Sequence, residues 1–369
     1  MGLVSLVVRD FRNLRSAELN FSPTLNLIVG PNGAGKTSLL EALYFLGRGR
    51  SFRTSYAAPL IREGASGFLL HGCVDGPSGQ RLPIGMSRDA NVLRVRLGGQ
   101  PLRRLSELLP YFPFQVVTPD SHQLLQGGPR YRRRFLDWGL FHVEPTFFPE
   151  WQRYSQALKQ RNAALRAKSP KAEVQLWDRE LIESGLAIEE SRRRYLDQLL
   201  PTVEQTVADL VGITTIKWEY RAGWNRRLSF AEALDQSFEG DRVQRVTRTG
   251  PHRADLFPSI AGEAVHERVS RGQQKQIVIA LMLAQAAVYR QRTGRMCIFL
   301  IDDLASELDT SLRGRIWNQL RSLQAQVFLS AIEPSLLDLG GCENIAQFHV
   351  EQGQILSDIL PTHFEETLK

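Results

Sequence analysis

The alternation of apolar and polar residues first predicts a strand, a tight loop and a helix near the N-terminus. Residues 25–29 form an apolar run typical of a strand, and residues 38–46 carry apolar side chains at helical spacing. The loop between them reads Gly-Pro-Asn-Gly-Ala-Gly-Lys-Thr over residues 30–37, which fits the P-loop pattern G-x-x-x-x-G-K-[ST]. Because strand and helix both stand in the required places, the match predicts a site for a nucleoside triphosphate.

Each part of this loop has a chemical task. Its glycines let successive backbone N–H groups point at phosphate oxygens, and the start of the helix adds partial positive charge. Lys36 is expected to reach the β- and γ-phosphates, and the Thr37 hydroxyl is expected to hold Mg²⁺. The residues predicted to bind ATP here are Gly30, Pro31, Asn32, Gly33, Ala34, Gly35, Lys36, Thr37 and Ser38.

The remaining pattern alternates strand-like and helical stretches. Residues 3–8 predict a buried strand, residues 11–14 a turn toward the P-loop strand, and residues 68–97 antiparallel hairpins. Apolar residues at helical spacing over 151–165 and 181–195 predict a helical hairpin, broken at Ser169-Pro170 and ended by Pro201. Further strands are predicted at 112–117, 213–220, 297–301 and 326–331, with a terminal hairpin turning near residue 353.

Length, composition and charge bound the possible functions. The 369 residues suffice for two domains, or for one domain with a large insertion. No apolar run is long enough to cross a bilayer, and three widely separated cysteines favour free thiols in a reducing cytoplasm. The formal net charge of +7 comes mainly from arginine and permits a polyanionic partner such as nucleic acid.

A second acidic motif completes the predicted nucleotide site. Four apolar residues, 298–301, precede Asp302 and Asp303, as in a Walker-B strand. Such an aspartate orders the Mg²⁺ shell, and the carboxylate beside it orients the attacking water. Lys36, Asp302 and Asp303 are therefore the predicted catalytic residues, and Thr37 and Asp302 the predicted Mg²⁺ ligands.

The order of these motifs resembles that of the ABC-type ATPases. Residues 270–273 read Ser-Arg-Gly-Gln, and Gly272 stands 30 residues before Asp302 with one predicted helix between them. In ABC-type ATPases this signature contacts the γ-phosphate bound by the other subunit, which implies that role for Ser270, Gly272 and Gln273. The same resemblance implies a Q-loop role for Gln115, at the end of a predicted strand, and a D-loop at residues 307–309.

Among ABC-type ATPases the chain resembles the RecF family of bacterial recombination mediators. Ser306-Glu307 and the paired aspartates at 302–303 follow that family rather than the transporters. The matching blocks extend over nearly the whole chain, at residues 11–14, 30–37, 39–42, 49–53, 119–120, 127–137, 160–165, 250–255, 270–275 and 301–309.

This resemblance implies an α/β fold with an ABC-type P-loop ATPase head, a mixed sheet around the P-loop helix, and an inserted, mostly helical second lobe. The expected lobes are residues 1–120 (ATPase lobe, P-loop and Gln115), 121–247 (helical lobe) and 248–369 (signature, Walker B and D-loop). The implied protein is cytoplasmic, dimerises with ATP and Mg²⁺, and hydrolyses ATP slowly as a DNA-stimulated switch.

The resemblance also implies partners. With RecO and RecR, such a protein binds gapped or single-/double-strand junction DNA, helps recombinase filaments form, and promotes the SOS response during recombinational repair and replication restart. The arginine-rich stretches are the candidates for DNA contact. These candidates are Arg12, Arg50, Arg53, Arg130, Arg132 and Arg133.

Three other functions fit parts of the pattern. The nucleotide-binding subunit of a transporter should carry a switch histidine after the strand ending at Ser330, where this chain has none. A small-molecule P-loop kinase would need a substrate pocket and lid but no Ser-x-Gly-Gln block. An SMC-like structural ATPase would need a longer helical insertion for its coiled coil.

Overall fold

A computed structural model describes residues 2–76, 79–89, 92–303, 310–333 and 344–358. Its internal contacts divide the chain into two compact units, residues 1–121 with 289–369 and residues 122–288. The lobe boundaries expected from the sequence follow residues 120 and 247. Residues 248–288, expected in the ATPase lobe, belong instead to the second unit.

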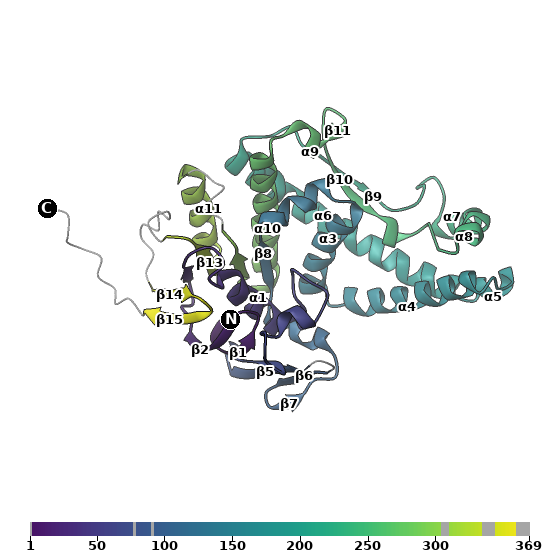
Figure 1. The fold of residues 1–369 in the computed structure, drawn as a ribbon. Coiled ribbons are helices and arrows are strands. Elements are labelled where there is room, and N and C mark those ends of the chain that lie inside the picture. The colour runs from purple at the N-terminus through teal and green to yellow at the C-terminus, as the bar shows by residue number, and fades with distance from the viewer. Residues whose placement is uncertain (1, 77–78, 90–91, 304–309, 334–343, 359–369) are drawn as a thin grey trace. The chain divides into compact units, whose positions relative to one another are not determined.

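A six-stranded, mixed sheet carries the P-loop in the first unit (Figure 1). Its strand order is β15-β14-β3-β13-β12-β8, and every neighbouring pair is parallel except β14 with β15. The carboxyl ends of β3, β13 and β12 therefore meet at one edge, where ligands bind in open α/β sheets. The strands are β3 (Leu25–Val29), β8 (Phe114–Val117), β12 (Ile298–Ile301), β13 (Gln326–Ala331), β14 (Ile345–Glu351) and β15 (Gln354–Asp358).

A second, antiparallel sheet has the order β2-β1-β4-β5-β6-β7. The predicted hairpins over residues 68–97 are confirmed, but residues 11–14 do not lead directly to the P-loop strand. Instead Arg12 and Asn13 form a two-residue turn that returns the chain as β2, with Phe11 paired to Leu14. The strands are β1 (Leu3–Phe11), β2 (Leu14–Asn20), β4 (Gly67–Asp75), β5 (Arg81–Asp89), β6 (Leu93–Leu97) and β7 (Gln100–Pro101).

Helix α1 (Lys36–Arg48) packs against both sheets. It contacts β1, β4 and β5 of the antiparallel sheet and β12 and β13 of the parallel one. Because α1 is covered by both sheets, it carries apolar side chains on all of its faces. Leu39, Leu43 and Leu46 are fully buried. The helix ends at Gly49, whose left-handed conformation (φ 62°) closes the last turn. The other helices of this unit are η1 (Ala58–Leu60), η2 (Leu105–Tyr111), η3 (Pro119–His122) and α11 (Thr310–Ser322).

The second unit is mostly helical and contains a small sheet of order β11-β10-β9. Its helices are α2 (Gln123–Gln126), α3 (Pro129–Val143), α4 (Phe147–Arg166), α5 (Lys171–Gln175), α6 (Asp178–Val211), α7 (Phe230–Gln236), α8 (Phe238–Gln244), η4 (Pro251–Arg253), α9 (Val265–Arg268) and α10 (Arg271–Thr293), which ends in the first unit. Its strands are β9 (Lys217–Arg221), β10 (Asp255–Ile260) and β11 (Glu263–Ala264).

Helices α4 and α6 pack along each other, as the predicted helical hairpin requires (Figure 1). Helix α4 ends at Arg166, close to the predicted break at 169–170. The prediction that Pro201 ends the second helix is wrong, because α6 continues through it to Val211. An interior proline costs roughly 3 kcal/mol, and the buried Leu199 and Val203 on either side offset that cost through packing.

No helix in the described part of the chain is both long and apolar enough to span a membrane.

Candidate nucleotide-binding site

Residues 30–37 form a loop between the end of β3 and the start of α1. Gly30, Gly33 and Gly35 all have positive φ angles, of 154°, 79° and 126°. A Cβ atom at Gly30 would lie 2.1 Å from the Val350 carbonyl oxygen, so that position also lacks space for a side chain. Gly35 begins the helix without a side-chain cap, which leaves the first N–H groups of α1 available to phosphate oxygens.

The Lys36 side chain folds back over this loop and is mostly buried. Its Nζ donates hydrogen bonds to the carbonyl oxygens of Gly30 (2.7 Å) and Pro31 (3.0 Å). An ammonium group has three donors, so one remains for a phosphate oxygen. The loop thus holds the charge of Lys36 at the place where the sequence predicts the β- and γ-phosphates.

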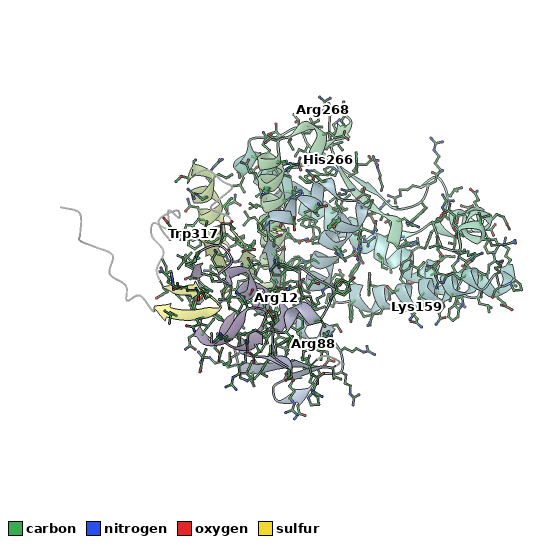
Figure 2. All side chains as sticks on the ribbon, in the orientation of Figure 1. Arg12, Arg88, Lys159, His266, Arg268 and Trp317 are labelled. Carbon is green, nitrogen blue, oxygen red and sulfur yellow. The ribbon has the colours of Figure 1, made fainter. Side chains whose placement is uncertain are left out.

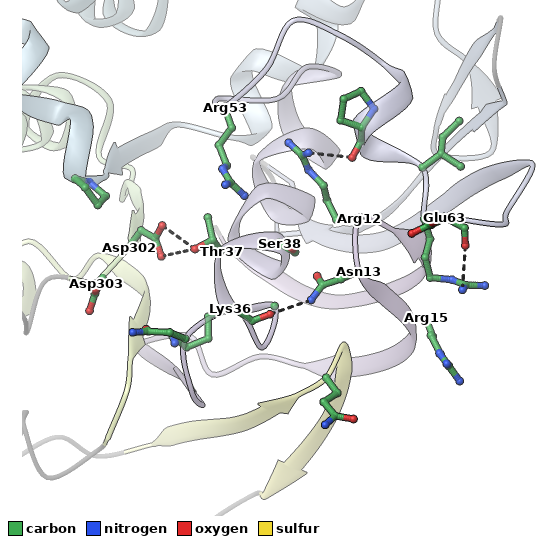
Figure 3. A pocket seen from close by; sticks show the side chains of 18 residues that line it. Arg12, Asn13, Arg15, Lys36, Thr37, Ser38, Arg53, Glu63, Asp302 and Asp303 are labelled. Atoms are coloured by element: carbon green, nitrogen blue, oxygen red, sulfur yellow. Dashed lines mark hydrogen bonds between the residues drawn. The ribbon is translucent and has the colours of Figure 1, made fainter.

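Thr37 and Asp302 meet across the carboxyl edge of the parallel sheet (Figure 3). The Thr37 hydroxyl lies 2.9 Å from Asp302 Oδ2 and 3.1 Å from Oδ1. A hydroxyl and a carboxylate oxygen are the hard donors that Mg²⁺ prefers, and Mg²⁺ typically takes only one or two protein ligands beside phosphates and water. The described residues contain no cluster of three or more acidic, His or Cys side chains that could hold a metal. As one hydroxyl and one carboxylate, the pair of Thr37 and Asp302 fits a Mg²⁺ ion bound together with a nucleotide.

These residues line a cavity of about 1000 Å³ within the first unit (Figure 3). That volume is at the upper end of the range for small-molecule sites. Basic side chains in its wall outnumber acidic ones, which suits a polyanionic ligand. The lining residues are Arg12, Asn13, Arg15, Asn32, Gly33, Gly35, Lys36, Thr37, Ser38, Arg53, Pro59, Ile61, Arg62, Glu63, Pro119, Asp302, Asp303 and Gln352.

Two turns outside the predicted motif support the P-loop. Asn13 Nδ2, in the β1–β2 turn, donates to the Ala34 carbonyl oxygen at 3.1 Å. The backbone N–H of Gly353, in the β14–β15 turn, donates to the same oxygen at 2.9 Å. Both turns are expected from the sequence pattern, but the pattern predicts no role at the site for either. The signal for Asn13 was its place in the matching block 11–14.

Arg12 links the first turn to helix α1. Its guanidinium forms two 2.8 Å hydrogen bonds with the Glu41 carboxylate, which is fully buried, and a third with the Pro59 carbonyl oxygen. Ser51 also donates to Glu41, and Arg53 lies 3.9 Å from it. The predicted DNA contacts Arg12 and Arg53 thus line the nucleotide cavity, where Arg12 is held by a buried carboxylate.

Other predicted site residues are not among those that line this cavity. Gln115 is the second residue of β8, not its end, and is 5% exposed beside Phe299 of β12. Its predicted position at a strand end is wrong, because β8 continues for two residues beyond Gln115 and pairs with β12 along this length. Ser270 and Gly272 lie in the second unit, at the exposed start of α10. The predicted D-loop, 307–309, lies outside the described residues.

The predicted DNA contacts in α3 divide by burial. Arg132 is 8% exposed and forms two hydrogen bonds with Asp255, at 2.7 and 3.0 Å. Arg132 therefore forms a structural ion pair with Asp255 and is not a DNA contact. Arg133 donates to the Ala254 carbonyl oxygen, and burial beside Arg192 lowers its pKa. Arg130 is exposed, as is Arg50 in the first unit.

Basic side chains lie on many elements of both units. Figure 2 labels Arg12 and Arg88 in the first unit and Lys159 and Arg268 in the second. Arg88 belongs to β5, Lys159 to α4 and Arg268 to α9. The basic residues are therefore distributed over several elements and not confined to one.

Comparisons with known proteins agree with this geometry. The family model described as RecF/RecN/SMC N terminal domain matches residues 2–355. The chain is 41% identical over 356 residues to the DNA replication and repair protein RecF of Edwardsiella ictaluri, covering 96% of this chain and 99% of that protein. It is 41% identical over 357 residues to RecF of Photorhabdus laumondii, covering 96% and 98%.

Solved structures resemble the chain over the same extent. One, titled "Structure of the recombination mediator protein RecF-ATPrS in RecFOR pathway", has a TM-score of 0.85 at 25% identity and covers 96% of this chain and 97% of its own. A corresponding RecF-ATP structure has a TM-score of 0.84 at 25% identity, with the same coverage. An Smc head bound to ScpA, with a TM-score of 0.61 at 14% identity and 98% coverage of each chain, shares the fold. The chain therefore belongs to the RecF family of DNA replication and repair proteins.

Proposed function

We propose that this chain is an ATP-controlled recombination mediator that binds DNA as an ATP-bound dimer. The observation that carries the proposal is the cavity that gathers the P-loop, Thr37 and Asp302 around space for a nucleotide. The solved relatives named as RecF-ATP and RecF-ATPrS support ATP as that nucleotide. Mg²⁺ would be held by Thr37 and Asp302.

The chemistry follows from the positions of the side chains. Lys36 would neutralise charge on the β- and γ-phosphates while the P-loop N–H groups hold their oxygens. Asp303 lines the cavity beside Asp302, where its carboxylate can orient the attacking water. Mg²⁺, when bound with the nucleotide, supplies charge neutralisation. We assign the chain slow ATP hydrolysis that acts as a switch, stimulated by DNA.

The signature block supports dimerisation. Ser270 Oγ accepts the Gln273 backbone N–H at 3.2 Å, and Gln273 Oε1 accepts the Ser270 N–H at 3.0 Å, which forms a reciprocal cap on α10. The Ser270 hydroxyl proton stays available to donate to an anion. Because Ser270 is exposed and lies in another unit than the P-loop, we propose that it meets the γ-phosphate bound by a second copy.

The proposed partners follow from the family. The RecFOR pathway named for the solved relatives supports RecO- and RecR-type mediators, and through them the recombinase, as partners in the cytoplasm during the SOS response. Gapped or junction DNA is the proposed substrate. Exposed arginines such as Arg50 and Arg130 are the proposed contacts with the DNA backbone. Gln115 stays the proposed Q-loop residue that binds the nucleotide.

The test is the oligomeric state with and without nucleotide. ATP with Mg²⁺ should convert micromolar protein from monomer to dimer in light scattering, and moving a population from mostly monomer to mostly dimer needs about 5 kcal/mol of differential binding. Ser270→Arg should stay monomeric while still binding ATP. Gln236→Arg, which adds the same charge at an exposed end of α7, should dimerise like the wild type. A wild-type chain that stays monomeric with ATP would refute the dimer.

A further inference from the structure

One buried hydroxyl at the end of β13 contacts both acidic residues of the cavity. Ser330 Oγ lies 2.7 Å from Asp302 Oδ1, and the backbone nitrogen of Asp303 lies 2.9 Å from the same Oγ. A serine hydroxyl has one proton, so it donates to the Asp302 carboxylate and accepts from the Asp303 N–H. Ser330 is 0% exposed, so water does not compete for either hydrogen bond.

The sheet topology explains why this serine reaches both acids. Strand β13 lies between the P-loop strand β3 and the Walker-B strand β12. Leu329 pairs with Ile301 of β12 and with Leu27 of β3, so Ser330 stands one residue beyond that level, beside Asp302.

The contact fixes the orientation of Asp302. Its Oδ1 accepts the Ser330 proton, and Oδ2 lies 2.9 Å from the Thr37 hydroxyl. A hydrogen bond to a carboxylate is charge-assisted, and two donors at two oxygens leave the group one orientation. Partners that orient a metal-ligating carboxylate in this way typically change metal affinity 10- to 100-fold when removed.

The contact also holds the backbone of Asp303. This residue has a φ of 54°, in the left-handed region that non-glycine residues rarely adopt. Its N–H is tied to Ser330, and its side chain lines the cavity. One hydroxyl therefore couples the direction of the Asp302 carboxylate to the backbone that presents Asp303.

We propose that Ser330 is a positioning residue for the Mg²⁺–nucleotide complex, acting through Asp302 and Asp303. The inference rests on the proposed nucleotide site and assigns a role to a residue outside its known motifs. A purely structural serine would only satisfy the Asp303 N–H. The two roles differ in one measurable respect, because a positioning role alters the Mg²⁺ dependence of nucleotide binding and a structural role does not.

The experiment measures binding of fluorescent mant-ATP to the full-length chain during a Mg²⁺ titration and, separately, in EDTA. Ser330→Ala removes the hydroxyl, and Ser330→Cys keeps its size but donates weakly. Both should raise the Mg²⁺ concentration at half-maximal binding about tenfold and change affinity in EDTA less than twofold. Ser330→Thr keeps the hydroxyl and should restore the wild-type midpoint.

A matched control is Ser184→Ala, which removes an equally buried hydroxyl that donates to the Glu180 carbonyl oxygen in the second unit. Its Mg²⁺ midpoint should equal that of the wild type. Unchanged midpoints in Ser330→Ala and Ser330→Cys, or equal losses with and without Mg²⁺, would overturn the positioning role alone. A wild-type chain that binds no mant-ATP under any condition would refute the proposed nucleotide site together with this inference.

Discussion

His252 in the second unit is held in its neutral form by its surroundings. Its Nε2 lies 2.9 Å from the Thr247 carbonyl oxygen, so this nitrogen carries the proton, and its Nδ1 accepts from the Tyr154 hydroxyl at 2.5 Å. Burial is the main reason why the pKa of His252 falls to about 4. Neighbouring positive charges add to the effect, and they belong to Arg253, Arg133 and Arg192.

This pKa predicts that the second unit loses stability in mild acid. An unfolded histidine titrates near pH 6.5, so below that pH the unfolded chain binds a proton that the folded chain excludes. The stability that His252 contributes is complete above about pH 7 and is lost as the pH falls toward 4. The expected loss between pH 7.5 and pH 5 is about 2 kcal/mol.

Urea unfolding followed by tryptophan fluorescence measures this loss, since five of the six tryptophans lie in residues 122–288. His252→Gln keeps a donor and an acceptor but cannot be protonated. Its stability should therefore fall by about 2 kcal/mol less than that of the wild type between the two pH values. Equal acid sensitivity of both proteins would contradict the neutral, buried histidine.

The sequence shows where arginines cluster, but it does not always show which of them are buried. Arg130 and Arg132 belong to one basic cluster, yet Arg130 is exposed and Arg132 is paired with buried Asp255. A spacing signal was present, because Arg132 precedes the buried Phe135 and Leu136 by three and four residues and so shares their helix face. The partner Asp255 lies 123 residues away, where no local pattern could identify it.

At the scale of elements, the C-terminal hairpin supports the P-loop through its turn. Gln352 and Gly353 connect β14 to β15 with positive φ angles of 46° and 77°. The Gly353 N–H bonds to the Ala34 carbonyl oxygen, and its own carbonyl oxygen accepts the Arg15 N–H at 3.3 Å. The turn thus joins the β1–β2 hairpin to the P-loop.

We predict that Gly353→Ala weakens ATP binding about tenfold. A Cβ atom at Gly353 would lie 2.0 Å from the Asn13 carbonyl oxygen, so the turn must move and release Ala34. Losing a hydrogen bond typically costs about 1 kcal/mol, and the displaced P-loop adds to that cost. Calorimetric titration with ATP and Mg²⁺ measures the affinity.

Gly99→Ala is the matched control for backbone strain. Gly99 has a φ of 80° in the β6–β7 turn, and a Cβ atom there would meet nothing within 4 Å. Both variants carry the left-handed strain of about 1–2 kcal/mol, but only Gly353→Ala disturbs the P-loop. Equal ATP affinities in the two variants would refute a role for the hairpin turn.

Local elements with strong signals were predictable, and those set by tertiary packing were not. The strand–loop–helix at 25–48 and the terminal hairpin agree with the sequence pattern because glycine positions and apolar spacing determine them locally. Pro201 was expected to end a helix, but packing on both sides carries α6 through it. Gln115 was expected at a strand end, but pairing with β12 places it inside β8.

At the scale of the molecule, the first unit is assembled from the two ends of the chain. Strand β3 comes from the N-terminal part, and β12, β13 and β14 come from residues beyond 289. Asp302 therefore reaches Thr37 only when both parts have folded together. The order of motifs could predict this arrangement, because a P-loop and a Walker-B strand function only in one sheet.

We propose that the bound nucleotide controls DNA binding. We expect the distributed basic residues to give each copy several weak contacts with DNA phosphates, and an ATP-bound dimer would combine two such surfaces. Affinity for a gapped duplex should therefore rise with ATP without new base contacts. Because the proposed contacts are to phosphates, log K for DNA binding should fall with log salt by about 0.9 per phosphate neutralised.

The most direct measurement titrates one labelled gapped duplex at two salt concentrations, with ATP or ADP, using the wild type, Ser270→Arg and Gln236→Arg. We expect the wild type and Gln236→Arg to bind the duplex tightly and with salt sensitivity only when ATP is present. Ser270→Arg should bind it weakly with ATP and with ADP. Binding of equal affinity with ATP, with ADP and in Ser270→Arg would contradict control of DNA binding by the nucleotide.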